Sequence, residues 1–322
     1  MKHTDEIICA DAITGLKTLD SESVECCVTS PPYYGLRDYG VDGQIGIEQS
    51  PEEYIARLTD VFTEVRRVLK SDGTLWINIA DSYAGSGKGA TAESDSKNEK
   101  GRYLLSGESK AKLMPTKWAD IKPKDMIGIP WMLAFSLRES GWYLRSDIIW
   151  HKPNALPEGV KDRPIKSYEH IFLLSKSARY YYDYMAIREP LKRKITKQNK
   201  HEPSINSKYV EQNFRHKWMD KLNKGFSERD NNFRKKRDVW EINTNTYRMK
   251  EHFAMYPEKL IEPCILAGSK VGGVVLDPFF GSGTTGAVAK RLGRKFLGID
   301  LNPRFCDLAK ERIDKVKAEK GG

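Results

Sequence analysis

Short runs of apolar and β-branched residues recur along the chain, separated by stretches with the spacing of amphipathic helices. The runs predict seven strands, over residues 7–9, 24–29, 74–79, 146–150, 169–174, 274–277 and 296–299. After the second strand, Ser50 begins a capping-box sequence with Pro51 in the first turn, and apolar residues then recur every three or four positions up to Leu69. We expect a helix there, and further helices over 257–267, over 283–293 and from Asn302 onward.

Strands that alternate with helices of this length predict an α/β fold, with a mostly parallel sheet and helices on both of its faces. Two stretches interrupt the alternation. Residues 82–125 are rich in Gly, Ser and Lys, and their lack of periodicity predicts a long mobile loop. Residues 183–250 have no strong period, and their aromatic residues are scattered among charges. We therefore expect residues 1–182 and 251–322 to form one domain around a separate region, 183–250.

The net charge of +10 is concentrated in part of that region. Residues 188–250 contain 18 Lys or Arg and 8 Asp or Glu, so the rest of the 322-residue chain is neutral. A basic module of this kind favours contact with a polyanion such as nucleic acid, although a soluble basic insertion would have the same composition. The densest run is Arg234-Lys235-Lys236-Arg237, which we take as the candidate DNA-binding segment.

Other classes of protein fit the composition poorly. No window approaches 18 consecutive apolar residues, and the first residues lack a secretory signal pattern, so neither a membrane span nor secretion is expected. The five cysteines form no C-x-x-C pair, which argues against a disulfide scaffold or a thiolate zinc site. We expect a cytoplasmic protein without a metal site.

A glycine-rich turn between a strand and a helix is the first motif with chemical content. Residues 274–286 read VVLDPFFGSGTTG, in which glycines allow a ligand to approach the backbone and a helix N-terminus offers free N–H groups. Asp300 follows the next strand and is suited to accept hydrogen bonds from ribose hydroxyls. The spacing equally suits a dinucleotide, so the motif alone predicts an adenosine-containing cofactor without saying which. The candidate contacts are Asp277, Phe279, Gly281, Ser282, Gly283, Thr284, Thr285 and Asp300.

The second motif, Ser30-Pro31-Pro32-Tyr33, follows the strand 24–29 at its carboxyl end, where open α/β sheets bind ligands. Consecutive prolines stiffen the turn. The Ser30 hydroxyl and the Pro31 carbonyl can together accept both hydrogens of an exocyclic amine. Tyr33 offers a flat face on which a base extruded from a duplex can stack.

At these two motifs the sequence resembles the DNA amino-methyltransferases that use S-adenosylmethionine, and in particular their circularly permuted β group. In that group the S/D-P-P-Y motif comes first, the target-recognition region lies in the middle and the F-x-G-x-G motif comes last. The resemblance implies a Rossmann-like, seven-stranded, circularly permuted fold in which 183–250 is the inserted target-recognition region. It also implies that the first strand lies beside strand 296–299, and that the catalytic and cofactor strands are adjacent at the centre of the sheet.

The resemblance further assigns individual residues. It places Asp11 near the adenine ring, Asp300 at the ribose and Phe253, in the segment 252–257, at the methionine end of the cofactor. Residues 75–81 and 150–154 occupy the strand and base-pocket positions. The partners implied are double-stranded DNA and, in a prokaryotic or phage setting, a cognate restriction endonuclease, while the oligomeric state stays open.

The target base is either cytosine or adenine. Serine at the first position of the tetrapeptide is more often associated with N4 of cytosine, and aspartate with N6 of adenine, so we expect cytosine and keep adenine as the alternative. The P-C dipeptide that carbon-5 methylation would need occurs only at Pro263-Cys264, inside the predicted helix 257–267, so we do not expect that chemistry. Other rivals are a nicotinamide-dependent dehydrogenase, a methyltransferase acting on RNA or protein, and an inactive DNA-binding protein.

Overall fold

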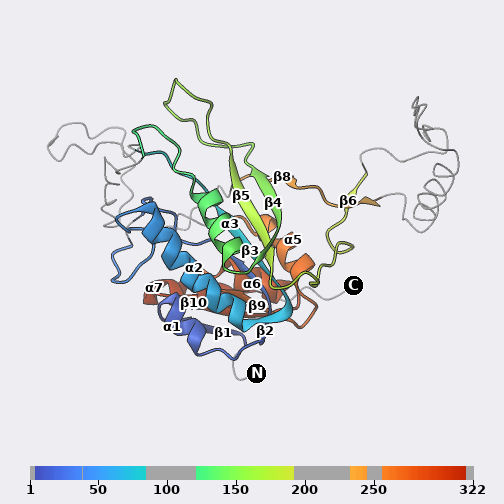
Figure 1. The fold of residues 1–322 in the computed structure, drawn as a ribbon. Helices are drawn as coiled ribbons and strands as arrows, with labels where there is room; N and C mark the ends of the chain where they lie inside the picture. Colours follow the sequence, from blue (N-terminus) through green and yellow to red (C-terminus); the bar gives the residue numbers. More distant parts are fainter. Residues whose placement is uncertain (1–3, 38, 85–120, 192–232, 245–255, 317–322) are drawn as a thin grey trace, which may run out of the picture. The chain divides into compact units, whose positions relative to one another are not determined.

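The computed structural model describes residues 4–37, 39–84, 121–191, 233–244 and 256–316 (Figure 1). Contacts within the chain divide it into two compact units. The main unit contains Met1–Tyr182 and Asp238–Gly322, and the inserted unit contains Asp183–Arg237. The inserted unit begins where the sequence predicted, but it ends before residue 250.

The main unit is built on one eight-stranded sheet. Across the sheet its strands are β1 (Glu6–Cys9), β10 (Lys295–Asp300), β9 (Val274–Asp277), β2 (Val24–Thr29), β3 (Leu69–Ile79), β5 (Tyr168–Ser175), β4 (Tyr143–His151) and β8 (Val239–Glu241). All neighbouring strands pair in parallel except β3 with β5 and β5 with β4. The sheet is therefore mostly parallel, as predicted.

Helices cover both faces of this sheet (Figure 1). On one face α2 contacts both α1 and α3, and on the other α6 contacts both α5 and α7. Their bounds are α1 (Ala12–Lys17), α2 (Pro51–Val68), α3 (Ile129–Glu139), α5 (Glu258–Gly268), α6 (Thr284–Arg291) and α7 (Pro303–Asp314). The predicted cap of α2 forms, because Ser50 Oγ accepts a hydrogen bond from the Glu53 amide at 3.2 Å. Its apolar stripe, including Leu58, Phe62 and Val65, is fully buried against the sheet.

The centre of the sheet is a topological switch point. Strand β2 continues through α2 to β3 on one side, whereas β9 continues through α6 to β10 on the other. The carboxyl ends of β2 and β9 are therefore adjacent and diverge, which is where open sheets of this class bind ligands. Strand β1 pairs with β10, so both topological consequences of the family resemblance are confirmed.

All seven predicted strands are present, and the four predicted helices correspond to α2, α5, α6 and α7. The sequence prediction missed α1, α3, β8 and the two short strands β6 (Glu189–Pro190) and β7 (Phe233–Arg234). Strand β8 lies inside the range predicted as the separate basic region, yet it pairs with β4 at the edge of the main sheet. Most of the predicted mobile loop, residues 85–120, lies outside the described residues, but its two ends meet through the hydrogen bond from the Ala84 amide to the Asp125 carbonyl.

None of the helices in the described ranges is both long enough and apolar enough to cross a lipid bilayer.

Candidate active site

The Ser-Pro-Pro-Tyr turn leaves the carboxyl end of β2 and lines a large pocket. All four predicted residues, Ser30 to Tyr33, contribute to the pocket wall. The Tyr54 hydroxyl on α2 donates a hydrogen bond to the Pro32 carbonyl at 2.8 Å, which fastens the turn from behind. The turn is therefore held by a buried helix rather than left as a free loop.

The glycine-rich turn leaves the carboxyl end of β9 and lines the same pocket. Phe279, Gly281, Ser282 and Thr284 line the pocket, as does Asp300 at the end of β10. Gly281 (φ 51°) and Gly283 (φ 74°) have left-handed backbone conformations that other residues rarely adopt. Both motifs thus reach one cavity, as their positions at the switch point predict.

Asp300 closes the glycine-rich turn from the neighbouring strand. Its carboxylate accepts hydrogen bonds from the Gly281 amide at 2.6 Å and from the Asn302 amide at 2.8 Å. Burial raises the pKa of Asp300 to about 6, although these two amides act in the opposite direction. The carboxylate keeps lone pairs that can accept further hydrogen bonds from a ligand.

Asp277 has a different position from the one expected of a cofactor contact. It is 1% exposed, and it lies behind the pocket wall rather than in it. It accepts hydrogen bonds from the hydroxyls of Thr29 (2.6 Å), Thr285 (2.6 Å) and Tyr256 (3.0 Å) and from the Phe279 amide (3.0 Å). Asp277 and Thr285 therefore join β2, β9 and α6 beneath the glycine-rich turn. Burial raises the pKa of Asp277, which these four donors oppose.

The remaining predicted cofactor contacts are distributed as follows. Asp11 lines the pocket and caps α1, because its side chain accepts a hydrogen bond from the Thr14 amide at 3.0 Å. Gly283 caps α6 and does not line the pocket. Phe253 lies outside the described residues. The contacts proposed for these residues stay predictions.

A polar cluster around the Tyr33 hydroxyl was not predicted. The hydroxyl donates a hydrogen bond to Glu169 Oε2 at 2.6 Å and accepts one from Asn78 Nδ2 at 2.6 Å. Asn78 Nδ2 also donates to Glu169 Oε2 at 2.7 Å, and Lys152 forms an ion pair with the same carboxylate. All four side chains line the pocket. Glu169 is the second residue of β5, and an acid next to the apolar run 171–174 was the signal in the sequence.

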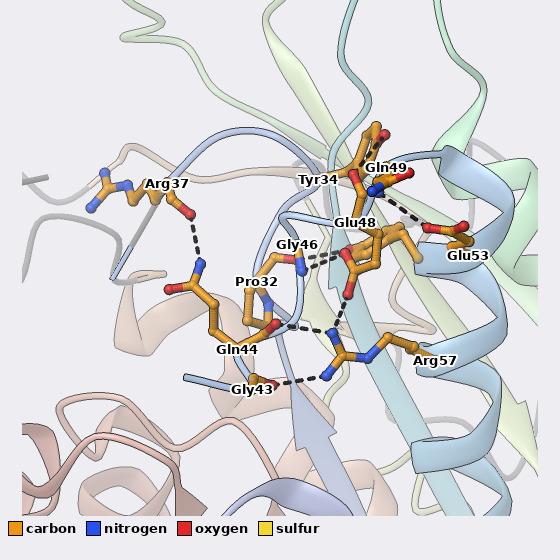
Figure 2. Close-up of polar contacts among 11 residues, drawn as sticks. Pro32, Tyr34, Arg37, Gly43, Gln44, Gly46, Glu48, Gln49, Glu53 and Arg57 are labelled. Carbon is orange, nitrogen blue, oxygen red and sulfur yellow. Dashed lines mark hydrogen bonds and ion pairs between the residues drawn. The ribbon is translucent and has the colours of Figure 1, made fainter. Parts of the chain in front are cut away.

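The loop between the tetrapeptide and α2, residues 35–49, is a second unpredicted part of the pocket wall (Figure 2). Arg57 of α2 donates to the carbonyls of Gly43 (2.8 Å) and Gln44 (3.0 Å) and pairs with Glu48 at 2.7 Å. Figure 2 shows this guanidinium reaching from the helix to three points of the loop. One side chain therefore holds the loop in place.

The resulting pocket has a volume of about 1160 Å³. Pockets that bind one drug-sized ligand have volumes of about 300–1,000 Å³, so this pocket is large enough to take a cofactor and part of a second substrate. Carboxylates line it on the side of the glycine-rich turn, and Tyr33 with its polar cluster lines it on the side of the tetrapeptide. The pocket therefore offers acceptors that suit a nucleoside-like group, and a flat aromatic ring that suits a planar, amine-bearing group.

Comparison with known proteins identifies the family to which this chain belongs. Residues 24–311 match the family model N6_N4_Mtase, described as DNA methylase. The chain belongs to the N6/N4 family of DNA methyltransferases. It is 48% identical over 308 residues to the type II methyltransferase M.SmaI of Serratia marcescens, covering 96% of this chain and 90% of that protein.

Two solved structures share the fold of this methyltransferase. The PvuII DNA methyltransferase, described as cytosine-N4-specific, has a TM-score of 0.61 at 18% identity and covers 96% of this chain and 86% of its own. The methylase TTHA0409 of Thermus thermophilus, complexed with S-adenosyl-L-methionine, has a TM-score of 0.56 at 23% identity, with coverage of 96% and 93%. The cofactor of this methyltransferase is S-adenosylmethionine.

The pocket fits that cofactor. Its ribose hydroxyls need acceptors, and Asp300 on the pocket wall has lone pairs that can accept from them. Asp11 adds a second carboxylate to the pocket, which suits a cationic ligand. The left-handed glycines of the turn leave room for close approach of a ligand to the backbone. Within the described residues, no cluster of acidic, His or Cys side chains has the makings of a metal site.

The predicted DNA-binding run of this methyltransferase is partly engaged in contacts within the inserted unit. Arg234 and Lys236 pair with Glu189 at 3.2 and 3.3 Å, and Arg234 belongs to strand β7 (Phe233–Arg234), which pairs with β6 (Glu189–Pro190). Lys235 Nζ lies 4.9 Å from the centre of the Tyr184 ring. The run is therefore organised by its neighbours, and DNA contact by Arg234 to Arg237 stays a prediction.

Proposed function

We propose that this methyltransferase modifies N4 of cytosine in duplex DNA. The observation that carries the proposal is the neutral Ser30 at the first position of the tetrapeptide, on the wall of a pocket that is also lined by the cofactor turn. The description of the PvuII enzyme, which shares the fold, as cytosine-N4-specific supports the same assignment. N6 of adenine is the alternative, because adenine also carries an exocyclic amine beside a ring acceptor.

The task of the protein is to make a poor nucleophile reactive. The lone pair of an exocyclic amine is delocalised into the ring. Acceptance of its two hydrogens by Ser30 Oγ and the Pro31 carbonyl favours a tetrahedral nitrogen with its lone pair out of the ring plane. The bound cofactor would supply an electrophilic methyl group on its sulfonium and would leave as a neutral thioether with the electron pair of the broken S–C bond. The amine nitrogen that takes the methyl group loses one of its hydrogens as a proton to solvent. Catalysis then consists mainly of orientation and electrostatics.

The other parts of the site hold the two reactants. We assign the ribose to Asp300, the adenine side to Asp11 and the methionine end to Phe253, with Phe279, Gly281, Ser282 and Thr284 along the turn. Asp277 and Thr285 act from beneath by fixing that turn. Tyr33 offers its ring to the extruded base, whose removal from the duplex costs a few kcal/mol.

The inserted unit is the proposed target-recognition region. Its basic residues would contact phosphates, and these contacts would supply affinity rather than sequence specificity. The similarity to M.SmaI, which is named as a type II methyltransferase, supports a restriction-modification setting with a cognate endonuclease as partner.

The test is to incubate the protein with duplex DNA and S-adenosylmethionine carrying a labelled methyl group, digest the DNA and separate the nucleosides by mass. We expect N4-methylcytosine, and we expect Ser30→Ala to slow its formation strongly, with measurable residual activity, while retaining cofactor binding. N6-methyladenine without N4-methylcytosine would overturn the base assignment. Absence of label from DNA would overturn the activity.

A further inference from the structure

The Tyr33 hydroxyl is the centre of a hydrogen-bonded network that reaches Ser30. Ser30 Oγ lies 3.4 Å from the Tyr33 hydroxyl, which in turn contacts Asn78 and Glu169 at 2.6 Å each. Glu169 and Asn78 are 8% and 5% exposed, so water competes little with these contacts. The network therefore connects the residue that begins the tetrapeptide with a carboxylate on a distant strand.

The directions of these hydrogen bonds follow from the groups that make them. Glu169 is paired with Lys152, and as a carboxylate it only accepts. Burial raises the pKa of Tyr33 well above its usual value, and the nearby Glu169 charge raises it further, so the phenol keeps its hydrogen. Tyr33 therefore donates its single hydrogen to Glu169, and its oxygen can only accept from other groups.

Ser30 then has one way to satisfy its contact with Tyr33. One lone pair of the Tyr33 oxygen accepts from Asn78, and the other can accept the Ser30 hydrogen. With that hydrogen committed to Tyr33, both lone pairs of Ser30 Oγ are left to accept. This matters because a hydroxyl whose hydrogen points at the target amine is repelled by the amine hydrogens. It cannot then accept a hydrogen bond from the amine in that direction.

We propose that Glu169 is a positioning residue which, acting through Tyr33, turns the Ser30 hydroxyl into an acceptor for the target amine. The proposal rests on the proposed function of Ser30 and explains how a neutral serine can act as an acceptor. An ionised aspartate at that position would have no hydrogen to direct. Lys152 and Asn78 complete the array, because they hold the carboxylate to which Tyr33 donates.

Glu169→Gln tests the proposal with almost no change in shape. A glutamine amide can donate to the Tyr33 oxygen, which releases the Tyr33 hydrogen toward Ser30 and reverses the network. We expect kcat for methyl transfer to fall by roughly 100-fold, as for a misplaced catalytic group, while the KM for cofactor and the affinity for DNA stay within about twofold. Tyr33→Phe keeps the ring for stacking and is expected to give a similar loss.

The decisive measurement is a double-mutant cycle in kcat. Since Glu169 acts through Tyr33, Tyr33→Phe with Glu169→Gln should be no slower than the slower single variant, and Glu169→Gln should add nothing to Ser30→Ala. Asp147→Asn is the matched control. Asp147 on β4 accepts a hydrogen bond from His170 on β5, the strand that also carries Glu169, but Asp147 does not line the pocket. The control variant should leave kcat unchanged.

Multiplicative losses in the cycle, an unchanged kcat in Glu169→Gln, or a loss confined to KM would each overturn the proposal. Counting total labelled methyl groups keeps this result separate from the base assignment. A product on adenine would refute the proposed target base and leave the cycle intact, whereas an inactive wild-type protein would refute the proposed function itself.

Discussion

Three carboxyl groups lie at the ends of β9 and β10 and at the start of β5, in or just behind the pocket wall, and their surroundings give each a different task. Asp277 is enclosed by four donors and holds backbone and side chains together. Asp300 is bound by two backbone amides and still lines the pocket. Glu169 forms an ion pair with the Lys152 ammonium and accepts hydrogen bonds from the Tyr33 phenol and the Asn78 amide. Residue type alone does not separate these tasks, because the donors around each group decide them.

Asp300 gives a prediction of pH dependence. Its pKa of about 6 means that its carboxyl group is largely protonated at pH 5 and largely ionised at pH 7. The ionised form is the better acceptor for ribose hydroxyls and attracts a cationic cofactor, so affinity should rise with pH up to about 6 and then level off. We predict that the Kd for S-adenosylmethionine, measured by calorimetry, is about tenfold weaker at pH 5 than at pH 7.

Asp300→Asn is the variant that isolates this effect. It should bind the cofactor more weakly at pH 7 and lose most of the pH dependence. Asp11 provides a comparison: burial raises its pKa, but hydrogen bonds from Thr14 and from the backbone amides at positions 11 and 13 together hold it below the usual value. Asp11→Asn should therefore keep the pH dependence. A variant at position 300 that retained the full pH dependence would assign the titration to another group.

Sequence analysis found the site residues whose positions follow from nearby sequence, and it missed those whose positions depend on tertiary pairing. Asp300 was predicted because it ends a strand at a fixed distance after a glycine motif. Glu169 was missed because β5 runs antiparallel to β3, so the start of β5, rather than its end, reaches the pocket edge. That reversal depends on tertiary pairing, which a periodicity argument does not contain.

At the scale of elements, strands with long apolar runs and helices with clear caps were predictable. Two of the missed elements have weaker local signals: α1 has only six residues, and β8 has three, with only Trp240 buried. Strand β8 is defined by pairing with β4 and by the Trp150 indole, which donates to the Ile242 carbonyl at 2.7 Å. Its place in the sheet follows from contacts across about 90 residues of sequence rather than from its own pattern.

The attachment of loop 35–49 to α2 gives a prediction at this scale. Because Arg57 supplies hydrogen bonds to Gly43, Gln44 and Glu48 together, its removal should free a wall of the cofactor pocket. We predict that Arg57→Ala weakens cofactor binding about tenfold, about 1.4 kcal/mol, through the cost of ordering the loop on binding. Hydrogen exchange of the loop amides should increase in the same variant.

The control for this experiment lies on the same helix. Arg67 also binds backbone carbonyls, those of Leu16 and Leu19, but it does not line the pocket. Arg67→Ala should lower the thermal midpoint without changing cofactor affinity. Arg57→Lys should resemble Arg57→Ala, because one ammonium cannot reproduce the planar fork that reaches three acceptors. Full affinity in Arg57→Ala would show that the loop is ordered by other contacts.

At the scale of the whole molecule, the order of motifs and the order of strands explain each other. The tetrapeptide and the glycine-rich turn are about 250 residues apart in the chain, yet they follow adjacent strands, β2 and β9. Strand β1, near the start of the chain, pairs with β10, near the end of the chain. The inserted unit lies between the two halves in sequence, so its size can vary without disturbing the sheet.

The concentrated positive charge gives the prediction for the whole molecule. If Arg234, Lys235, Lys236 and Arg237 contact phosphates, log affinity for duplex DNA should fall linearly with log salt concentration. Replacing all four with Gln should then flatten that slope by about one unit for each phosphate that is no longer neutralised. Fluorescence anisotropy with labelled duplex, titrated from about 50 to 200 mM salt, measures the slope over a suitable range.

Two further variants separate specific binding from net charge. Lys17, Lys259, Lys295 and Lys310 are exposed cations of the main unit, and replacing these four with Gln changes the net charge equally. That control should leave the slope nearly unchanged if the inserted unit binds the phosphates. Glu189 pairs with both Arg234 and Lys236, so Glu189→Gln should release them and strengthen DNA binding. Equal flattening by both sets of four substitutions would mean that DNA responds to the total charge of the protein, and the run 234–237 would then have no special part in binding.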